Sequence, residues 1–79
     1  RLELDKAKTQ VKVGAEYRHY KAINKTYKVI GLGFQEANDE ICVIYRAEYG
    51  EQITFVRPLV SWLQYVAWND AKVPRFTKV

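Results

Sequence analysis

The sequence predicts a mainly β protein, either a small five- or six-stranded SH3-like barrel or a bent antiparallel sheet, with at most one short helical turn. Two observations lead to this fold class. β-branched and aromatic residues gather in short runs, and turn-forming residues separate the runs about every 8–12 residues. No segment keeps the period of a long helix. Because 79 residues suffice for one domain only, we expect a single core.

The first 13 residues differ in character from the rest. They are rich in lysine, and leucine or valine alternates with polar residues near each end of the segment. We therefore expect residues 1–13 to form an N-terminal arm, a linker or an added edge strand. Gly14 follows, and residues 14–79 are predicted to form a single small β domain.

Three strands are expected in the first half of this domain. Residues 16–21 are predicted to form the first strand, and a turn at Asn24-Lys25 leads into the second strand, residues 26–34. A hairpin loop over residues 36–39 then precedes the third strand, residues 40–49.

The third strand has the clearest period of two. Its odd-numbered positions are all apolar or aromatic, so they are expected to face the core. The other face carries Cys42 and Ile44, then Arg46 and Glu48. That face is therefore predicted to change from buried to solvent-exposed along the strand.

A turn and a proline bound the fourth strand. Residues 50–52 contain glycine and polar side chains typical of a turn, and residues 53–57 are expected to form the strand. Pro58 ends its ladder, because proline has no N–H to donate.

A short helix and a hairpin are expected in the remainder of the chain. Residues 59–63 are predicted to form a single helical turn. Residues 64–68 and 73–78 are then expected to pair as a last hairpin around Asn69-Asp70, two residues that tolerate turn conformations.

The net charge of +4 invites a nucleic-acid interpretation, but its distribution weakens it. Residues 1–13 contribute +2, so the other 66 residues carry only +2. The sequence therefore predicts a compact part whose charge is nearly balanced.

The predicted location is the cytoplasm. Cys42 is the only cysteine, so no internal disulfide can form, and small secreted domains usually depend on such bonds. No apolar stretch approaches the roughly 20 residues that span a bilayer, and no signal-peptide pattern opens the chain. We therefore expect no membrane association.

The chain lacks the residues that several kinds of functional site require. A structural zinc site needs four Cys or His ligands, and this chain has one of each, so no metal is expected. The four glycines form no phosphate loop, and no cofactor is expected. Cys42 and His19 remain as a possible nucleophile and base. However, Cys42 sits among apolar strand residues, where a free cysteine behaves as a small apolar side chain.

Four blocks place an arginine beside an aromatic ring or a proline, at residues 17–21, 45–49, 56–58 and 73–76. Arginine offers a planar fork of donors that suits carboxylate or phosphate, and it stacks on rings. Two interpretations stay open. The arginines converge on one face and hold an anion or a nucleic-acid backbone, or each stacks on a ring, pairs with a glutamate and braces the thin core. The candidate binding residues are Arg18, His19, Tyr20, Arg46, Arg57, Arg75 and Trp62.

The same blocks resemble the small bacterial family known as domain of unknown function 1653. Its pattern contains Tyr-Arg-His-Tyr-Lys, Tyr-Arg-x-x-Tyr, Trp-Val-Arg-Pro and Val-Pro-Arg-Phe in this order, and the likeness covers about residues 14–76. Phe55 stands where the pattern has tryptophan, and residues 35–38 differ from the family's polar loop. The resemblance implies a type of domain, marked by its arginines, and no assigned activity.

These observations predict a binding or accessory module and not an enzyme. The first hypothesis is a protein partner or self-association through exposed aromatic and arginine side chains, because Trp62, Tyr65 and Trp68 exceed what a thin core hides. The alternative is binding of nucleic acid, a nucleotide or another anion through the arginines. An enzyme that uses Cys42 and His19 is the least favoured hypothesis.

Overall fold

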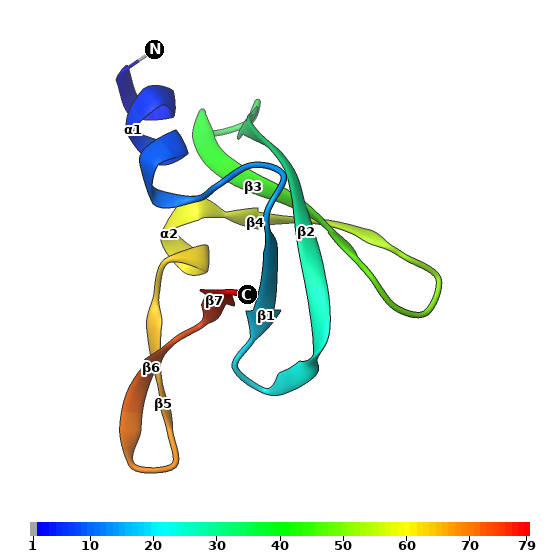
Figure 1. Ribbon diagram of the computed structural model, residues 1–79. Helices are drawn as coiled ribbons and strands as arrows, with labels where there is room; N and C mark the ends of the chain where they lie inside the picture. The colour runs from blue at the N-terminus through cyan, green and yellow to red at the C-terminus, as the bar shows by residue number, and fades with distance from the viewer. Residues whose placement is uncertain (1) are drawn as a thin grey trace.

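The computed structural model describes residues 2–79, so Arg1, the first residue of the predicted arm, lies outside the described residues (Figure 1). Within this range the chain forms seven strands and two helices. In chain order these are α1 (Leu2–Gln10), β1 (Glu16–His19), β2 (Ala22–Gln35), β3 (Glu40–Ala47), β4 (Thr54–Pro58), α2 (Leu59–Trp62), β5 (Tyr65–Trp68), β6 (Ala71–Pro74) and β7 (Phe76–Lys78).

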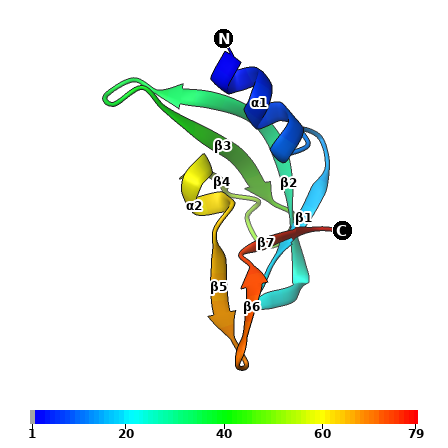
Figure 2. The ribbon, with the colours of Figure 1, turned by 90° about the vertical axis from the view of Figure 1, so that its left-hand side faces the viewer.

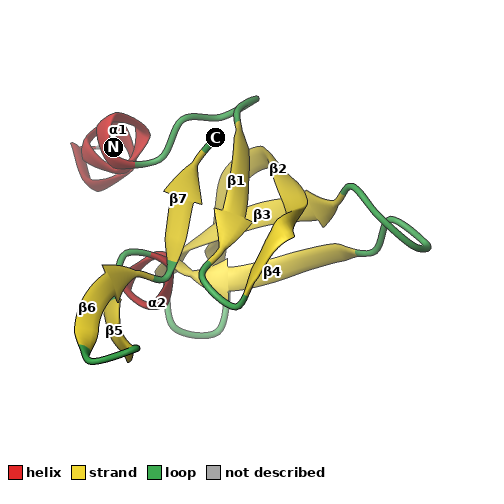
Figure 3. Ribbon diagram, turned by 60° about the horizontal axis from the view of Figure 1, so that its bottom comes forward, coloured by secondary structure: helices red, strands yellow, loops and turns green. Residues whose placement is uncertain are grey.

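The strands form two antiparallel sheets, which confirms the mainly β prediction. The main sheet has the strand order β4-β3-β2-β1-β7, and β5 pairs with β6 in a separate hairpin. Helix α1 and the β5–β6 hairpin lie at opposite ends of the molecule (Figures 1 and 2). In Figure 3 the five strands of the main sheet curl around a common interior. Of the two predicted forms, the bent sheet is present, and the strands do not close into a barrel.

Two irregularities bend β2. Its register against β3 shifts between Val29 and Gly31, so Ile30 has no partner in that ladder. Against β1, Thr26 pairs with Arg18 and Ala22 pairs with His19. Residues 23–25 therefore have no partner in this ladder. Extra residues of this kind bend a strand and increase its twist. They allow one strand of 14 residues to follow a strongly curved sheet.

The first turn does not lie where the sequence predicts it. The chain reverses at Tyr20 and Lys21, whereas Asn24 and Lys25 lie inside β2. The backbone amide of Tyr20 donates a hydrogen bond to the carbonyl of Arg75, at 3.0 Å. A contact with a distant segment thus selects the turn. Asn24 and Lys25, whose composition suggested a turn, belong to the irregular part of β2 instead.

Most of the later elements agree with the sequence prediction. The loop at 36–39, the third strand, the turn at 50–52 and the single helical turn after Pro58 are all present. Asn69 and Asp70 have φ values of 52° and 63°, as a tight hairpin turn requires. The predicted strand over residues 73–78 instead divides at Arg75, because β7 leaves the hairpin to pair with β1.

The added edge strand expected at the N-terminus is absent, because residues 2–10 form helix α1. Leu4, Ala7 and Val11 follow one another at helical spacing; Leu4 is half-buried, and Ala7 and Val11 have no exposed surface. This apolar stripe is narrow and contains a small residue, so the short alternations beside it concealed the helix. No helix within residues 2–79 combines the length and apolar character that a membrane crossing demands.

Aromatic rings dominate the core. Trp62 of α2 and Phe76 of β7 stack with ring centroids 3.7 Å apart and planes 5° from parallel. Tyr17 and Tyr45 meet Trp62 edge to face, at 5.3 Å and 4.9 Å. Trp62 is only 3% exposed, so its predicted role as an exposed binding residue is wrong. The buried core cluster comprises Val11, Tyr17, Val29, Val43, Tyr45, Trp62 and Phe76.

We expect Trp62→Ala to lower the free energy of unfolding by about 3–5 kcal/mol, because it removes a large buried side chain and leaves a cavity. Urea denaturation followed by circular dichroism measures this change. Val60→Ala, in the same helix at a side chain that is 68% exposed, serves as the matched control. It is expected to change the stability by no more than about 0.5 kcal/mol. Equal losses in the two variants would contradict a core built around Trp62.

Candidate functional site

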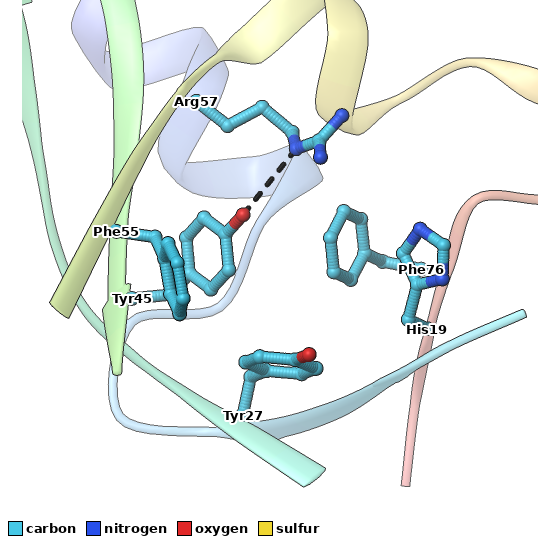
Figure 4. Close-up of a pocket in the computed structure, with 6 residues that line it drawn as sticks. All are labelled: His19, Tyr27, Tyr45, Phe55, Arg57 and Phe76. Atoms are coloured by element: carbon cyan, nitrogen blue, oxygen red, sulfur yellow. Dashed lines mark hydrogen bonds between the residues drawn. The ribbon is translucent and has the colours of Figure 1, made fainter. Parts of the chain in front are cut away.

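A pocket lies where the two edges of the main sheet approach each other. β4 and β7 are the outermost strands, yet the guanidinium carbon of Arg57 in β4 is 5.4 Å from the ring centroid of Phe76 in β7. The pocket has a volume of about 220 Å³, and its side chains converge from five strands (Figure 4). It is lined by His19, Tyr27, Tyr45, Phe55, Arg57 and Phe76.

The strand register places these rings side by side. Residues directly opposite each other in antiparallel strands share a face. Tyr45 pairs with Phe55, and their ring centroids are 5.6 Å apart; His19 pairs with Phe76, at 5.1 Å. The ring of Tyr27 lies 5.5 Å from Tyr45 and 6.2 Å from Phe76. Five rings therefore surround one small space.

Arg57 provides the charge of the pocket. Its Nε donates to the hydroxyl of Tyr45 at 3.3 Å, and its Nη1 donates to Oγ of Ser61 at 2.9 Å. A guanidinium has five N–H groups, so these two bonds leave donors available. Within residues 2–79 no carboxylate forms an ion pair or hydrogen bond with Arg57.

A second arginine lies beside the first. Nε of Arg75 donates to the carbonyl of Ser61 at 3.1 Å, and Nη2 donates to Oε1 of Gln64 at 3.1 Å. Ser61 thus accepts a hydrogen bond from Arg57 on its side chain and from Arg75 on its backbone. Both arginines are half-buried and both are held by neutral acceptors. The predicted pairing of these arginines with glutamate is absent from the part of the chain that the structure describes.

His19 sits in the electrostatic field of these cations. Burial lowers the pKa of His19, and Arg57, Arg75 and Lys21 lower it further by repelling the protonated ring. The backbone amide of Lys21 donates to Nδ1 of His19 at 3.3 Å, which assigns Nδ1 as an acceptor. His19 is therefore a neutral ring at neutral pH, with its proton on Nε2.

Tyr27, in β2, is also neutral. Burial, and then a hydrogen bond shared with the hydroxyl of Tyr49, raises the pKa of Tyr27 to about 12. Arg57 is consequently the charged side chain among the six that line the pocket.

Basic and acidic residues are concentrated in different segments of the chain. Residues 17–28 hold four lysines and arginines and no carboxylate, and residues 54–79 hold four and one aspartate. Residues 29–53, in contrast, contain five carboxylates and a single arginine. The loops of this acidic segment, after β2 and after β3, project away from the β5–β6 hairpin (Figure 1). The small net charge predicted for the compact part thus hides an uneven distribution of charge along the chain.

Two of the four predicted arginines converge. Arg57 and Arg75 meet beside the pocket, whereas Arg18 and Arg46 are exposed and alternate in their strands with buried tyrosines. Alternation along a strand places Arg18 and Arg46 on the outer face of the sheet. The assignment of strands alone does not reveal this difference. Arg75 belongs to no strand, and the position of Arg57 near Arg75 depends on the curl of the sheet.

The other predicted residues divide in the same way. His19 lines the pocket, and the ring of Tyr20 lies next to His19, with their ring centroids 4.6 Å apart. Trp62 lies in the core beneath the pocket, where it stacks on Phe76.

The four pocket residues that were not predicted from the sequence are all aromatic. Tyr27, Tyr45, Phe55 and Phe76 belong to expected strands, and the pattern of the sequence did not assign them to a binding site. Two signals were present. Phe55 and Arg57 are two residues apart, so they share a face of one strand. The charge separation between segments 17–28, 29–53 and 54–79 is also visible in the sequence alone.

Cys42 and His19 do not come together. Cys42 is buried on the outer face of the sheet, beside a second pocket of about 390 Å³ that Ile44 and Val56 also line. Burial raises the pKa of its thiol, and the nearby Glu40 raises it further. Within residues 2–79, no three His, Cys, Asp or Glu side chains gather as a metal ion would require.

Comparisons with known proteins give two matches. A family model described as a protein of unknown function (DUF1653) matches residues 15–78. The crystal structure of a DUF1653 protein from Bordetella bronchiseptica is similar, with 30% sequence identity and a TM-score of 0.75. The alignment covers 89% of this chain and 90% of that chain. No curated protein matches the sequence.

The pKa of His19 is expected to lie below 6.5, the ordinary value, in the folded protein. Because His19 is the only histidine, its ring signals in an NMR titration report this pKa directly. Arg57→Gln is expected to move the pKa up toward 6.5, and Arg46→Gln, on the outer face, to leave it unchanged. An unchanged pKa in Arg57→Gln would contradict the proximity of the two groups.

The same shift has a consequence for stability. The pKa of His19 is lower in the folded protein than in the unfolded chain, where it is about 6.5. The contribution of His19 to stability is therefore fully present at pH values above about 6.5. As the pH falls below about 6.5, protonation of His19 favours the unfolded chain, and this part of the stability is lost.

Proposed function

The chain belongs to the DUF1653 family of unknown function, and on this premise we propose that its pocket binds a ligand that carries both a planar ring and an anionic group. The observation that carries the proposal is the position of Arg57, a half-buried cation that faces five rings and is hydrogen-bonded only to neutral acceptors.

The cations explain the anionic group. Arg57 and Arg75 converge on Ser61, and no carboxylate in residues 2–79 offsets their repulsion through an ion pair. Like charges this close disfavour each other, and partial burial strengthens the effect. An anion that accepts from the remaining N–H groups of Arg57 removes this repulsion. Hydrogen bonds to charged groups are worth about 1.5–3 kcal/mol.

The rings explain the planar group. His19, Tyr27, Tyr45, Phe55 and Phe76 offer faces and edges to a second ring, and such contacts contribute about 0.5–1.5 kcal/mol each beyond burial. The pocket volume of about 220 Å³ is below the range of roughly 300–1,000 Å³ that is typical of sites for whole drug-sized ligands. It therefore suits one ring of a ligand, and the rest of a larger ligand lies outside.

We expect phenyl phosphate to bind more tightly than inorganic phosphate or phenol, because only phenyl phosphate engages both the rings and Arg57. Calorimetry gives the affinities, and NMR shift mapping locates the site. Arg57→Gln is expected to weaken phenyl phosphate binding by about tenfold or more. Arg46→Gln, which removes the same charge from the outer face, is the matched control. Equal affinity for the two variants, or shifts that map to the outer face, would overturn the proposal.

A second candidate function is self-association, the first of the two hypotheses drawn from the sequence. The observation in its favour is the edge strand β4, where Val56 is 64% exposed and Ile53, next to the strand, is 52% exposed. Unpaired edge strands with apolar side chains readily pair with a second chain. Trp62 takes no part in this candidate interface, because it is buried.

If β4 mediates self-association, Val56→Lys should shift the protein from dimer to monomer in sedimentation velocity experiments. Val79→Lys provides the matched control, because Val79 is also 64% exposed but follows β7 at the other edge of the sheet. A wild-type protein that is monomeric at every concentration would remove this candidate.

We propose binding and not catalysis for this domain, because the one nucleophile–base pair that the sequence suggested is divided between two faces of the sheet. The free thiol of Cys42 and the lack of a second cysteine support a reducing compartment such as the cytoplasm.

A further inference from the structure

A row of contacting rings leads from the pocket to the surface. His19, which lines the pocket, has its ring centroid 4.6 Å from that of Tyr20. Tyr20 in turn meets Trp68 of β5 at 5.2 Å, with planes 80° apart. Trp68 is 41% exposed, so the row ends in a ring that is open to a ligand. One end of this row is therefore packed against the core. At the other end, the exposed part of the Trp68 ring contacts no further ring of the described residues.

Two features of the backbone hold the row in place. The hydrogen bond from the Tyr20 amide to the Arg75 carbonyl fastens the β1–β2 turn to the junction between β6 and β7. The tight turn at Asn69-Asp70 reverses the hairpin directly after Trp68. In both Figure 1 and Figure 2 the β5–β6 hairpin and the β1–β2 turn lie at the same end of the molecule.

Cations accompany the rings. Nζ of Lys21 lies 5.7 Å from the centroid of the Tyr20 ring. Arg57 and Arg75 lie at the pocket end, and these three side chains are the cations that repel a proton from His19. The acidic loops of residues 29–53 project elsewhere. Rings and positive charges therefore share one strip of surface that starts at the pocket and ends at Trp68.

This arrangement matches a ligand in which ring and anion repeat. We propose that the strip binds single-stranded nucleic acid, with one base in the pocket, a neighbouring base against Trp68, and the intervening phosphates on Lys21, Arg57 and Arg75. The inference rests on the proposed function, because it identifies the larger ligand to which the ring and the anion belong. Stacking platforms beside a basic track are the usual means of binding single strands without sequence preference.

Two other polyanions fit the strip less well. A base in a duplex is paired and stacked, so it reaches a pocket of this size only after extrusion, at a cost of a few kcal/mol. An acidic peptide supplies carboxylates to the cations but no regular series of rings for the pocket and Trp68. Duplex DNA and an acidic peptide therefore serve as competing ligands in the test.

The test uses the complete chain with eight-residue oligo(dT) and oligo(U), and follows tryptophan fluorescence. Because Trp62 is buried, quenching on binding reports mainly on Trp68. Three phosphate contacts predict a slope of log affinity against log salt of about −2, which corresponds to an affinity about 20-fold lower at 200 mM than at 50 mM salt. Lys21→Gln is expected to reduce the slope by about 0.7. The comparison of the two oligonucleotides shows whether DNA or RNA is preferred.

Trp68→Ala tests the stacking contact. We expect it to weaken oligonucleotide binding by about 5- to 150-fold and to leave phenyl phosphate binding unchanged, which also shows that the variant is folded. Tyr65→Ala is the matched control, because Tyr65 lies in the same strand on the opposite face and is 66% exposed. It is expected to affect neither ligand. Phenyl phosphate is also expected to compete with the oligonucleotide.

The outcomes separate this inference from the proposed function. Binding of phenyl phosphate without binding of either oligonucleotide would overturn the inference and leave the proposed function intact, whereas binding of neither probe would overturn both. Tighter binding of polyglutamate or of duplex DNA than of the single strands would also overturn the inference, as would affinity that does not change with salt.

Discussion

Trp62 and Phe76 stack face to face, and this contact joins the two ends of the sheet. Trp62 follows β4, which is one edge strand, and Phe76 begins β7, which is the other. When the rings stack, the sheet has to curl, and the bulges of β2 permit the curvature. The pocket exists because of this curl: its lining includes Arg57 from one edge and His19 and Phe76 from the opposite side. A flat sheet with the same strands would hold these side chains far apart.

The polar groups around the pocket follow from the same geometry. Arg57 and Arg75 approach each other because α2 lies between their segments, and Ser61 of that helix accepts a hydrogen bond from each. Neutral partners orient the two guanidinium groups without neutralising them. The charge therefore remains available. Burial lowers the pKa of His19, and the charge of the two arginines lowers it further. Structural bracing and ligand recognition were alternatives on the sequence alone. The hydrogen bonds of Arg57 and Arg75 show the bracing, and the proposed ligand contacts the same two arginines.

The errors of the sequence prediction have a common origin in contacts between distant segments. The turn at Tyr20 depends on the carbonyl of Arg75, and the burial of Trp62 depends on Phe76. Helix α1 is stabilised where Val11 packs into the core, although its own apolar stripe is weak. In each case the local residues were compatible with two structures, and a partner far along the chain selected one of them.

The residue types and their alternation determined the mainly β class, most strand positions, the late hairpin turn and the membership of the DUF1653 family. These features depend on short-range properties: side-chain period, proline and turn residues, and blocks of a few consecutive residues. Only the tertiary structure decided which arginines meet. All four stand in similar blocks, but Arg57 and Arg75 reach the pocket and Arg18 and Arg46 face outward. The side on which a strand residue lies is a local property, whereas the curl that brings two sheet edges together arises from packing between them.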